Sequence, residues 1–258
     1  MTETGKVVSK VPAVTLVFWL VKIACTTLGE TGGDAVTMSM KLGYLTGTLI
    51  FAAVFVVAVA LQIVAKRFNP WLYWLTIIAT TTVGTTIADY VDRSLGIGYA
   101  GGSLILVAGL AASLIVWRLV TGSVDVASVT SARSEAFYWV TIMFSQTLGT
   151  ALGDWTADSA GMGYTGAALL FGGLLAVIAL LHVFTKTPKT WLFWAAFVLT
   201  RPLGAVVGDF LDKPLDHGGL NLDRFAASGV LVAIVVALIV FVPQRAGRHP
   251  GEGVNGSE

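Results

Sequence analysis

Apolar residues fall into eight long blocks that are separated by short polar connections. The blocks cover residues 11–33, 46–65, 71–90, 101–118, 136–156, 165–182, 190–210 and 227–243. An α-helix needs roughly 20 mostly apolar residues to cross a bilayer, so each block has about the length of one span. The pattern therefore predicts an all-α integral membrane protein with eight transmembrane helices, whose main partner is the lipid bilayer.

The composition supports the same class and excludes others. Hydrophobic residues make up 55% of the chain and charged residues 12%, whereas a soluble domain has about 25% charged residues. One cysteine, Cys25, and three histidines argue against a disulfide framework and against a zinc site. The sequence has no nucleotide-binding loop, nucleophile elbow or metalloprotease motif. We therefore expect no enzyme activity, no covalent cofactor and no nucleic-acid partner.

A four-fold repeat underlies the eight blocks. Each unit has an aromatic-Trp pair, then a glycine ten residues after the Trp, an aspartate five later and a glycine nine after that. The units read Phe18-Trp19, Gly29, Asp34, Gly43; Tyr73-Trp74, Gly84, Asp89, Gly98; Tyr138-Trp139, Gly149, Asp154, Gly163; and Phe193-Trp194, Gly204, Asp209, Gly218. The third unit follows the first, and the fourth the second, at an offset of 120 residues. Two successive duplications explain this spacing.

The repeat also predicts how the units are related in space. Each unit contains two spans, an even number, so all four enter the membrane in the same direction. We expect four parallel two-helix repeats and a pseudo-two-fold relation between the halves, about an axis along the membrane normal.

The same units divide the chain into five parts. These are an N-terminal tail (1–10), a first half with repeats 1 and 2 (11–118), a linker (119–135), a second half with repeats 3 and 4 (136–243) and a disordered C-terminal tail (244–258). The tails, the linker and the connections on their side carry ten of the sixteen basic residues. The opposite side has only Lys41, Arg93, Lys213 and Arg224. The positive-inside rule therefore places both termini and the linker in the cytoplasm.

Four stretches, CTTLGETGGD, TTTVGTTIAD, SQTLGTALGD and TRPLGAVVGD, resemble the units of a known family. Its members are bacterial membrane proteins catalogued as carrying a four-fold repeat of unknown function. The resemblance covers nearly the whole chain except the tails, and it implies a multi-pass protein of the bacterial cytoplasmic (inner) membrane. It implies no catalytic or binding residues, so the function has to be argued from the residues themselves.

Small residues recur four positions apart in the first helix of each unit. This spacing lets helix backbones approach closely in lipid. The pairs are Gly29/Gly33, Gly84/Ala88, Gly149/Gly153 and Gly204/Gly208. Two interpretations stay open: the four odd-numbered helices pack around a central axis, or each glycine stripe docks on its own hairpin partner.

A polar stripe follows the same helices, two residues before, one after and five after the first glycine. These positions share one helix face. They read Thr27, Glu30, Asp34; Thr82, Thr85, Asp89; Thr147, Thr150, Asp154; and Pro202, Ala205, Asp209. Carboxylates and hydroxyls are ligands of hard cations such as magnesium, manganese, calcium or sodium. We expect a cation site formed by Glu30, Asp34, Asp89, Asp154 and Asp209, with help from Thr27, Thr82 and Thr147. Alternatively, the aspartates lie at the interface or cap short helices in the outer loops.

Two basic residues also lie inside predicted spans, Lys22 and Arg201. They are either permanent partners of Glu30 or an aspartate, or counter-charges that are released when a cation arrives. Glu30 and the four aspartates give five negative charges against these two positive ones, and this excess favours a cation over an anion. Pro202 predicts a kink beside Arg201.

These observations lead to a transporter of a small hard cation as the first hypothesis. A divalent metal such as manganese or magnesium is the leading candidate, and sodium or proton coupling is compatible with the site. A pseudo-four-fold cation channel is the second hypothesis, and a non-transporting membrane scaffold or stress protein is the third. The string Thr81–Gly84 (TTVG) resembles a potassium filter, but the fourth unit reads RPLG. The oligomeric state, including a homo-oligomer, stays open.

Overall fold

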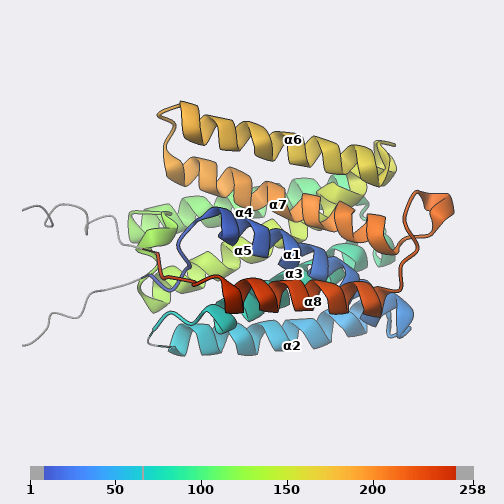
Figure 1. Ribbon diagram of the computed structural model, residues 1–258, viewed down its shortest axis with the longest axis horizontal. Coiled ribbons are helices and arrows are strands. Elements are labelled where there is room, and N and C mark those ends of the chain that lie inside the picture. The colour runs from blue at the N-terminus through green and yellow to red at the C-terminus, as the bar shows by residue number, and fades with distance from the viewer. Residues whose placement is uncertain (1–8, 66, 248–258) are drawn as a thin grey trace, which may run out of the picture.

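The computed structural model describes residues 9–65 and 67–247 (Figure 1). As the sequence predicts, this part of the chain is helical. Eight long helices follow one another: α1 (Leu16–Asp34), α2 (Gly43–Val64), α3 (Pro70–Asp89), α4 (Tyr99–Thr121), α5 (Ala132–Asp154), α6 (Gly163–Phe184), α7 (Lys189–Asp212) and α8 (Arg224–Phe241). Short π-helical turns η1 (Ala35–Ser39), η2 (Tyr90–Ser94) and η4 (Trp155–Ser159) continue α1, α3 and α5. Two 3₁₀ turns complete the set, η3 (Val126–Ser128) and η5 (Leu215–His217).

The four odd-numbered helices form an inner bundle. Their contacts close in a ring: α1 packs against α3, α3 against α5, α5 against α7, and α7 against α1. All four begin beside one aromatic cluster that includes Phe18, Trp74, Trp139 and Trp194. All four also reach their repeated aspartate at the opposite end, so they run in the same direction.

The even-numbered helices surround this bundle, and each packs against the next repeat. Helix α2 packs on α3, α4 on α5, α6 on α7, and α8 returns to α1. The outer helix of each repeat therefore packs on the inner helix of the next repeat. This exchange links all four repeats into one closed structure.

The outer helices expose apolar faces. Leu49, Leu104, Leu169 and Phe241 are 63%, 73%, 72% and 80% exposed. Within the described ranges, five helices are long and apolar enough to cross a membrane: α2, α4, α6, α7 and α8. Helices α1, α3 and α5 carry more threonines and carboxylates than the outer helices do, and most of these polar side chains are buried inside the bundle.

Local sequence explains where the helices begin. Residues 11–33 were expected to form one span, but α1 begins at Leu16, where the Thr15 side chain accepts a hydrogen bond from the Phe18 N–H at 3.4 Å. Asn69 caps α3 in the same way, and Pro70 occupies its first turn. Helix α4 extends to Thr121 and α5 begins at Ala132. The connection between the halves is therefore shorter than the predicted linker 119–135.

The last glycine of each repeat has a structural role. Gly43, Gly98, Gly163 and Gly218 have φ values of 76°, 77°, 64° and 84°. Residues with a Cβ rarely adopt this left-handed region. The glycines thus let the chain turn towards the outer helix.

Three tryptophans of the inner helices are buried, whereas Trp71 on α3 and Trp191 on α7 are 49% and 68% exposed. Trp74, Trp139 and Trp194 are 0%, 2% and 4% exposed and pack in the aromatic cluster. The Tyr73 and Tyr138 hydroxyls form a hydrogen bond of 2.6 Å in the same layer. This layer fills the bundle at the end where the odd helices begin.

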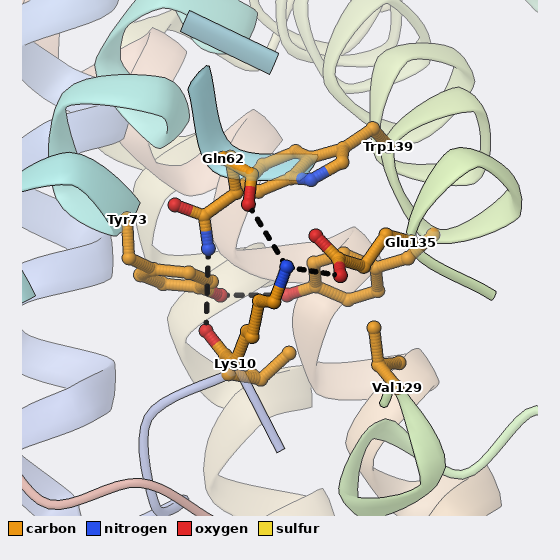
Figure 2. Close-up of a pocket in the computed structure, with 8 residues that line it drawn as sticks. Lys10, Gln62, Tyr73, Val129, Glu135 and Trp139 are labelled. Atoms are coloured by element: carbon orange, nitrogen blue, oxygen red, sulfur yellow. Dashed lines mark hydrogen bonds and ion pairs between the residues drawn. The ribbon is translucent and has the colours of Figure 1, made fainter. Parts of the chain in front are cut away.

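The described ends of the chain lie across that same end of the bundle. Residues Pro12 and Ala246 form an isolated β-bridge. Lys10 reaches inward, and its Nζ lies 2.7 Å from Oε1 of Glu135 and 3.2 Å from the Gln62 carbonyl oxygen (Figure 2). Of the predicted tails 1–10 and 244–258, the structure describes residues 9–10 and 244–247, and the rest lies outside the described residues.

Candidate functional site

The carboxylates of the polar stripe are buried at the far end of the inner helices. Glu30, Asp34, Asp89, Asp154 and Asp209 are between 1% and 3% exposed. The three aspartates that precede the π-helical turns form no side-chain cap. The capping interpretation is therefore wrong for Asp34, Asp89 and Asp154.

One layer of the site is centred on Arg201. Its Nη2 lies 2.9 Å from Oε2 of Glu30 and also donates to the hydroxyls of Thr85 and Thr150. Thr85 in turn donates to Oε2 of Glu30 at 3.3 Å. Arg201 on α7 therefore contacts α1, α3 and α5 at once. It lies at the centre of the inner bundle, and it is fully buried.

A second layer joins the four aspartates in pairs through two basic residues. Arg93 lies 2.8 Å from Asp89 and 3.3 Å from Asp154. Lys213 lies 3.0 Å from Asp209 and 2.5 Å from Asp34. Each cation belongs to an even-numbered repeat and reaches the aspartate of the next repeat.

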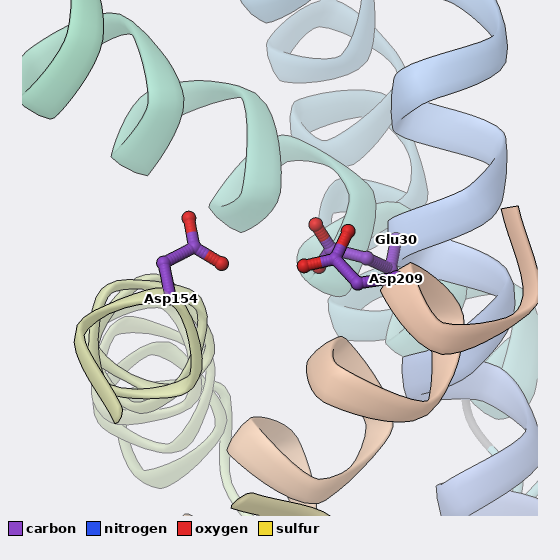
Figure 3. Close-up of side chains that lie close together, drawn as sticks. All are labelled: Glu30, Asp154 and Asp209. Atoms are coloured by element: carbon purple, nitrogen blue, oxygen red, sulfur yellow. The ribbon is translucent and has the colours of Figure 1, made fainter. Parts of the chain in front are cut away.

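Although these carboxylates pair with basic side chains, they also lie close enough together to act as ligands of a cation. One ligand oxygen each from Glu30, Asp154 and Asp209 lies within 4.8 Å of the others. Figure 3 shows Asp154 on α5 facing the other two side chains. A second group within the same limit comprises Asp34, Asp209 and Asp212. Among the described residues, Oδ1 of Asp154 and Oδ1 of Asp34 have no hydrogen-bond partner.

The five carboxylates that were expected to form one cation site thus do not all converge on one point. Glu30, Asp154 and Asp209 converge, and Asp34 joins Asp209 and Asp212. Asp89 is absent from both groups and pairs with Arg93. The arrangement offers two overlapping sets of three carboxylates.

The threonines expected to help at the site point their hydroxyls elsewhere. Thr27, Thr82 and Thr147 donate to the carbonyl oxygens four residues earlier in their own helices, at 3.0, 2.8 and 3.0 Å. Thr85 and Thr150, one position after the repeated glycines, contact Arg201 instead. The hydroxyls that contact the central charges are therefore those of Thr85 and Thr150, in the layer centred on Arg201.

Lys22 has a different environment from Arg201. Its Nζ donates to the Thr200 hydroxyl at 2.6 Å and to the Phe197 carbonyl oxygen at 3.1 Å. The same ammonium lies 3.8 Å from the centre of the Phe197 ring. Within the described part of the chain it has no carboxylate partner, so the ion pair considered for Lys22 is wrong.

The repeated glycines lie where inner helices meet. A Cβ on Gly29 would meet the Thr81 side chain, on Gly84 the Gln146 backbone, and on Gly204 the Thr26 side chain. On Gly149 it would lie 3.0 Å from Cδ of Pro202, which lies inside the continuous helix α7. Gly33, Gly153 and Gly208 face Thr85, Ala205 and Glu30. These contacts are between neighbouring inner helices and not within a hairpin.

Sequence reasoning missed Arg93, Lys213, Arg224 and Asp212. Arg93 and Lys213 each follow an aspartate by four residues and are themselves 120 residues apart, so the repeat carried the signal. Arg224 lies 2.8 Å from Asp212. The local charges become six carboxylates (Glu30, Asp34, Asp89, Asp154, Asp209, Asp212) against five cations (Lys22, Arg93, Arg201, Lys213, Arg224). The expected charge excess is therefore smaller than the sequence indicated.

The aspartates hold the two bridging cations in their charged form. Burial opposes the charge of Lys213, but Asp209 and Asp34 outweigh it and raise the pKa of Lys213 well above its usual value. Burial likewise opposes the charge of Arg93, and Asp89 and Asp154 raise its pKa. Both positions are thus occupied by protein cations at any physiological pH.

Comparisons with known proteins agree with this organisation. Neither the curated proteins nor the solved structures gave a match to the chain. A family model described as a Repeat of Unknown Function (DUF347) matches four times, at residues 17–68, 72–123, 137–187 and 192–244. Each match contains one inner helix and the outer helix that follows it. The chain therefore belongs to the family that carries this four-fold repeat of unknown function.

Proposed function

We propose that the protein crosses a bilayer eight times and transports a small hard cation. Membrane placement is supported by the exposed apolar faces of the outer helices, since soluble monomers rarely expose contiguous apolar patches of more than a few hundred Å². Helices α1, α3 and α5 cross as well in this proposal, because their polar residues are enclosed by the apolar outer ring. The four repeats then run parallel, and the 120-residue offset makes the halves pseudo-two-fold related.

The basic residues favour one orientation in the membrane. The end that carries Lys10, Arg67, Arg133 and Arg245 also holds both described chain ends. By the positive-inside rule, this end faces the cytoplasm and the aspartate end faces outward. The membrane implied by the family resemblance is the bacterial cytoplasmic membrane.

One observation carries the cation proposal: Glu30, Asp154 and Asp209 offer buried oxygens within 4.8 Å of one another. They come from three different helices, α1, α5 and α7. Buried carboxylates that share a small volume repel one another unless a positive charge or protons join them. Oxygen ligands suit magnesium or manganese best, and sodium is the alternative.

The bridging cations suggest how binding and release are coupled. Arg93 and Lys213 occupy positions between pairs of aspartates. An arriving metal competes with them for the same oxygens, so the basic side chains act as internal substitutes for the ion. Binding of the ion and movement of Arg93 or Lys213 then become one event.

A specific test uses the full chain in liposomes and in detergent. Manganese, magnesium, calcium and sodium are compared for a saturable rise in melting temperature and for flux. We expect Glu30→Gln and Asp154→Asn to abolish both effects while the protein stays folded. Asp158→Asn is the matched control, since Asp158 is exposed and lies four residues beyond Asp154. Unchanged flux in both site variants would refute the proposal.

A structural role for the charges is the second candidate, because Arg93 and Lys213 already neutralise the aspartates. In this case the protein is a membrane scaffold, and no cation changes its stability or crosses the bilayer. An open channel is less compatible with the described conformation, in which Arg201 and the aromatic cluster fill the inner bundle. The rate of flux per molecule separates a channel from a transporter.

A further inference from the structure

A groove is lined by residues of α1, α6 and α7 and by the segments 11–15, 125–127 and 245–247. Its volume is about 1070 Å³, just above the usual range of ligand sites in proteins, which ends at about 1000 Å³. The walls are apolar: Trp19 and Ile23 on α1, Leu175 and Ile178 on α6, and Phe193 and Ala196 on α7. The groove is separate from the carboxylate layers, because its residues belong to the other end of the inner helices.

The depth of the groove matches one leaflet of a bilayer. On α7 its lining begins at Lys189, continues through Leu192, Phe193 and Ala196, and ends at Thr200. The eleven residue steps from Lys189 to Thr200 span about 16 Å of helix. Half of a hydrocarbon core that is about 30 Å thick is about 15 Å. An acyl chain that enters from the end of the two termini would therefore lie along the whole groove.

The mouth of the groove is positively charged. Lys189 and Arg245 both line it and are exposed. Within the described residues neither forms an ion pair. Asp125, the acidic residue at the mouth, already accepts hydrogen bonds from the Thr190 hydroxyl at 3.1 Å and from the Ala127 N–H at 2.9 Å. The two cations thus remain available to an anionic group.

We propose that this groove binds one anionic phospholipid from the leaflet on the side of the two termini. The phosphate contacts Lys189 and Arg245, and one acyl chain packs along α1, α6 and α7. Basic pockets between membrane helices select anionic headgroups in this way. The proposal requires the membrane placement argued above but is independent of the cation.

The sequence of the chain favours a lipid over the chain's own C-terminal residues as the occupant. Residues 248–258 read RHPGEGVNGSE and contain one large apolar residue, Val254. Such a segment offers little to an apolar groove of this depth. An acyl chain with a phosphate fits both the walls and the mouth.

The test compares phosphatidylglycerol with phosphatidylcholine on the delipidated full chain in detergent, by melting temperature and native mass spectrometry. We expect phosphatidylglycerol to bind and stabilise, while phosphatidylcholine and glycerol phosphate do not. The double variant Lys189→Gln/Arg245→Gln should bind phosphatidylglycerol roughly 30-fold more weakly, because the loss of each basic residue should weaken binding by a factor of about 5. Lys186→Gln, next to the groove but outside its lining, should bind as the wild type does.

A second pair of variants tests the apolar walls. Ala179→Trp places a large side chain in the groove, and Ala176→Trp places it elsewhere on the exposed surface of α6. Only the first should weaken phosphatidylglycerol binding. A photo-reactive residue at Ile178 should cross-link to an acyl chain. Equal binding of the two lipids, or a cross-link from Ile178 to residues of the chain's own tails, would overturn the proposal.

Discussion

Arg201 on α7 and Glu30 on α1 form an ion pair of 2.9 Å at the centre of the inner bundle. Both side chains are buried, Arg201 completely and Glu30 to 3% exposure. Removing one partner of such a pair leaves an uncompensated charge away from water, which costs more than the pair contributes. The pair therefore fixes how α1 and α7 meet.

This pair predicts a large and non-additive effect on stability. Arg201→Met alone should destabilise the protein by about 3–5 kcal/mol, because Glu30 is left buried without its cation. The double variant Arg201→Met/Glu30→Gln should recover much of that loss. Melting temperatures of the wild type, both single variants and the double variant complete the cycle. Additive losses would show that the two side chains do not interact.

The bridging residues predict a gain in metal dependence. Lys213→Gln leaves Asp34 and Asp209 facing each other without their shared cation, so the variant should melt at a lower temperature. A divalent metal should then restore more stability than it gives the wild type, because it no longer competes with Lys213. The measurement is the melting temperature with and without manganese. Lys41→Gln, an exposed charge at the same end, serves as the control.

The same offset in the repeat predicts that Arg93 behaves like Lys213. Arg93→Gln removes the cation between Asp89 and Asp154. We expect a similar loss of melting temperature and a similar response to manganese. A metal response in one variant and not in the other would indicate that the two halves have diverged in function.

The glycines predict an opposite response at two positions. Gly149→Ala should destabilise by about 1–3 kcal/mol, since its Cβ would press on Arg201 and Pro202. Gly173→Ala, on α6, should be neutral or stabilising by up to about 1 kcal/mol, because a Cβ there meets nothing within 4 Å. Melting in detergent measures both. Equal stability of the two variants would contradict close packing of α5 on α7.

Alkaline pH should reveal the charge on Lys213. Its pKa in the folded protein is raised well above the usual value, and the largest favourable contributions come from Asp209 and Asp34, which outweigh burial. A lysine whose pKa is higher in the folded than in the unfolded protein stabilises the fold fully at pH values below its unfolded pKa of about 10.4. This stabilisation is lost as the pH rises through the folded pKa. The difference in melting temperature between wild type and Lys213→Gln should therefore stay constant from pH 7 to about 10 and shrink above it. A difference that already shrinks between pH 7 and 9 would contradict the pairing.

Much of the architecture follows from the sequence alone. The eight apolar blocks predict eight helices because helix length and hydrophobicity are local properties of the chain. The four-fold spacing of Trp, Gly and Asp predicts the repeat, which the family match confirms. The burial of the aspartates and the close approach at Gly149 are consistent with the same pattern, since both positions recur in register.

The tertiary structure decided the partners. Arg93 and Asp154 are 61 residues apart, and Lys213 and Asp34 are 179 apart. Which side chains meet at such distances depends on how the ring of inner helices closes, and no local pattern contains this. The ring also places each outer helix on the next repeat, leaves Lys22 beside Thr200 and puts Arg201 beside Glu30. Local periodicity sets which residues face inward, while the packing of one repeat on another sets which of them touch.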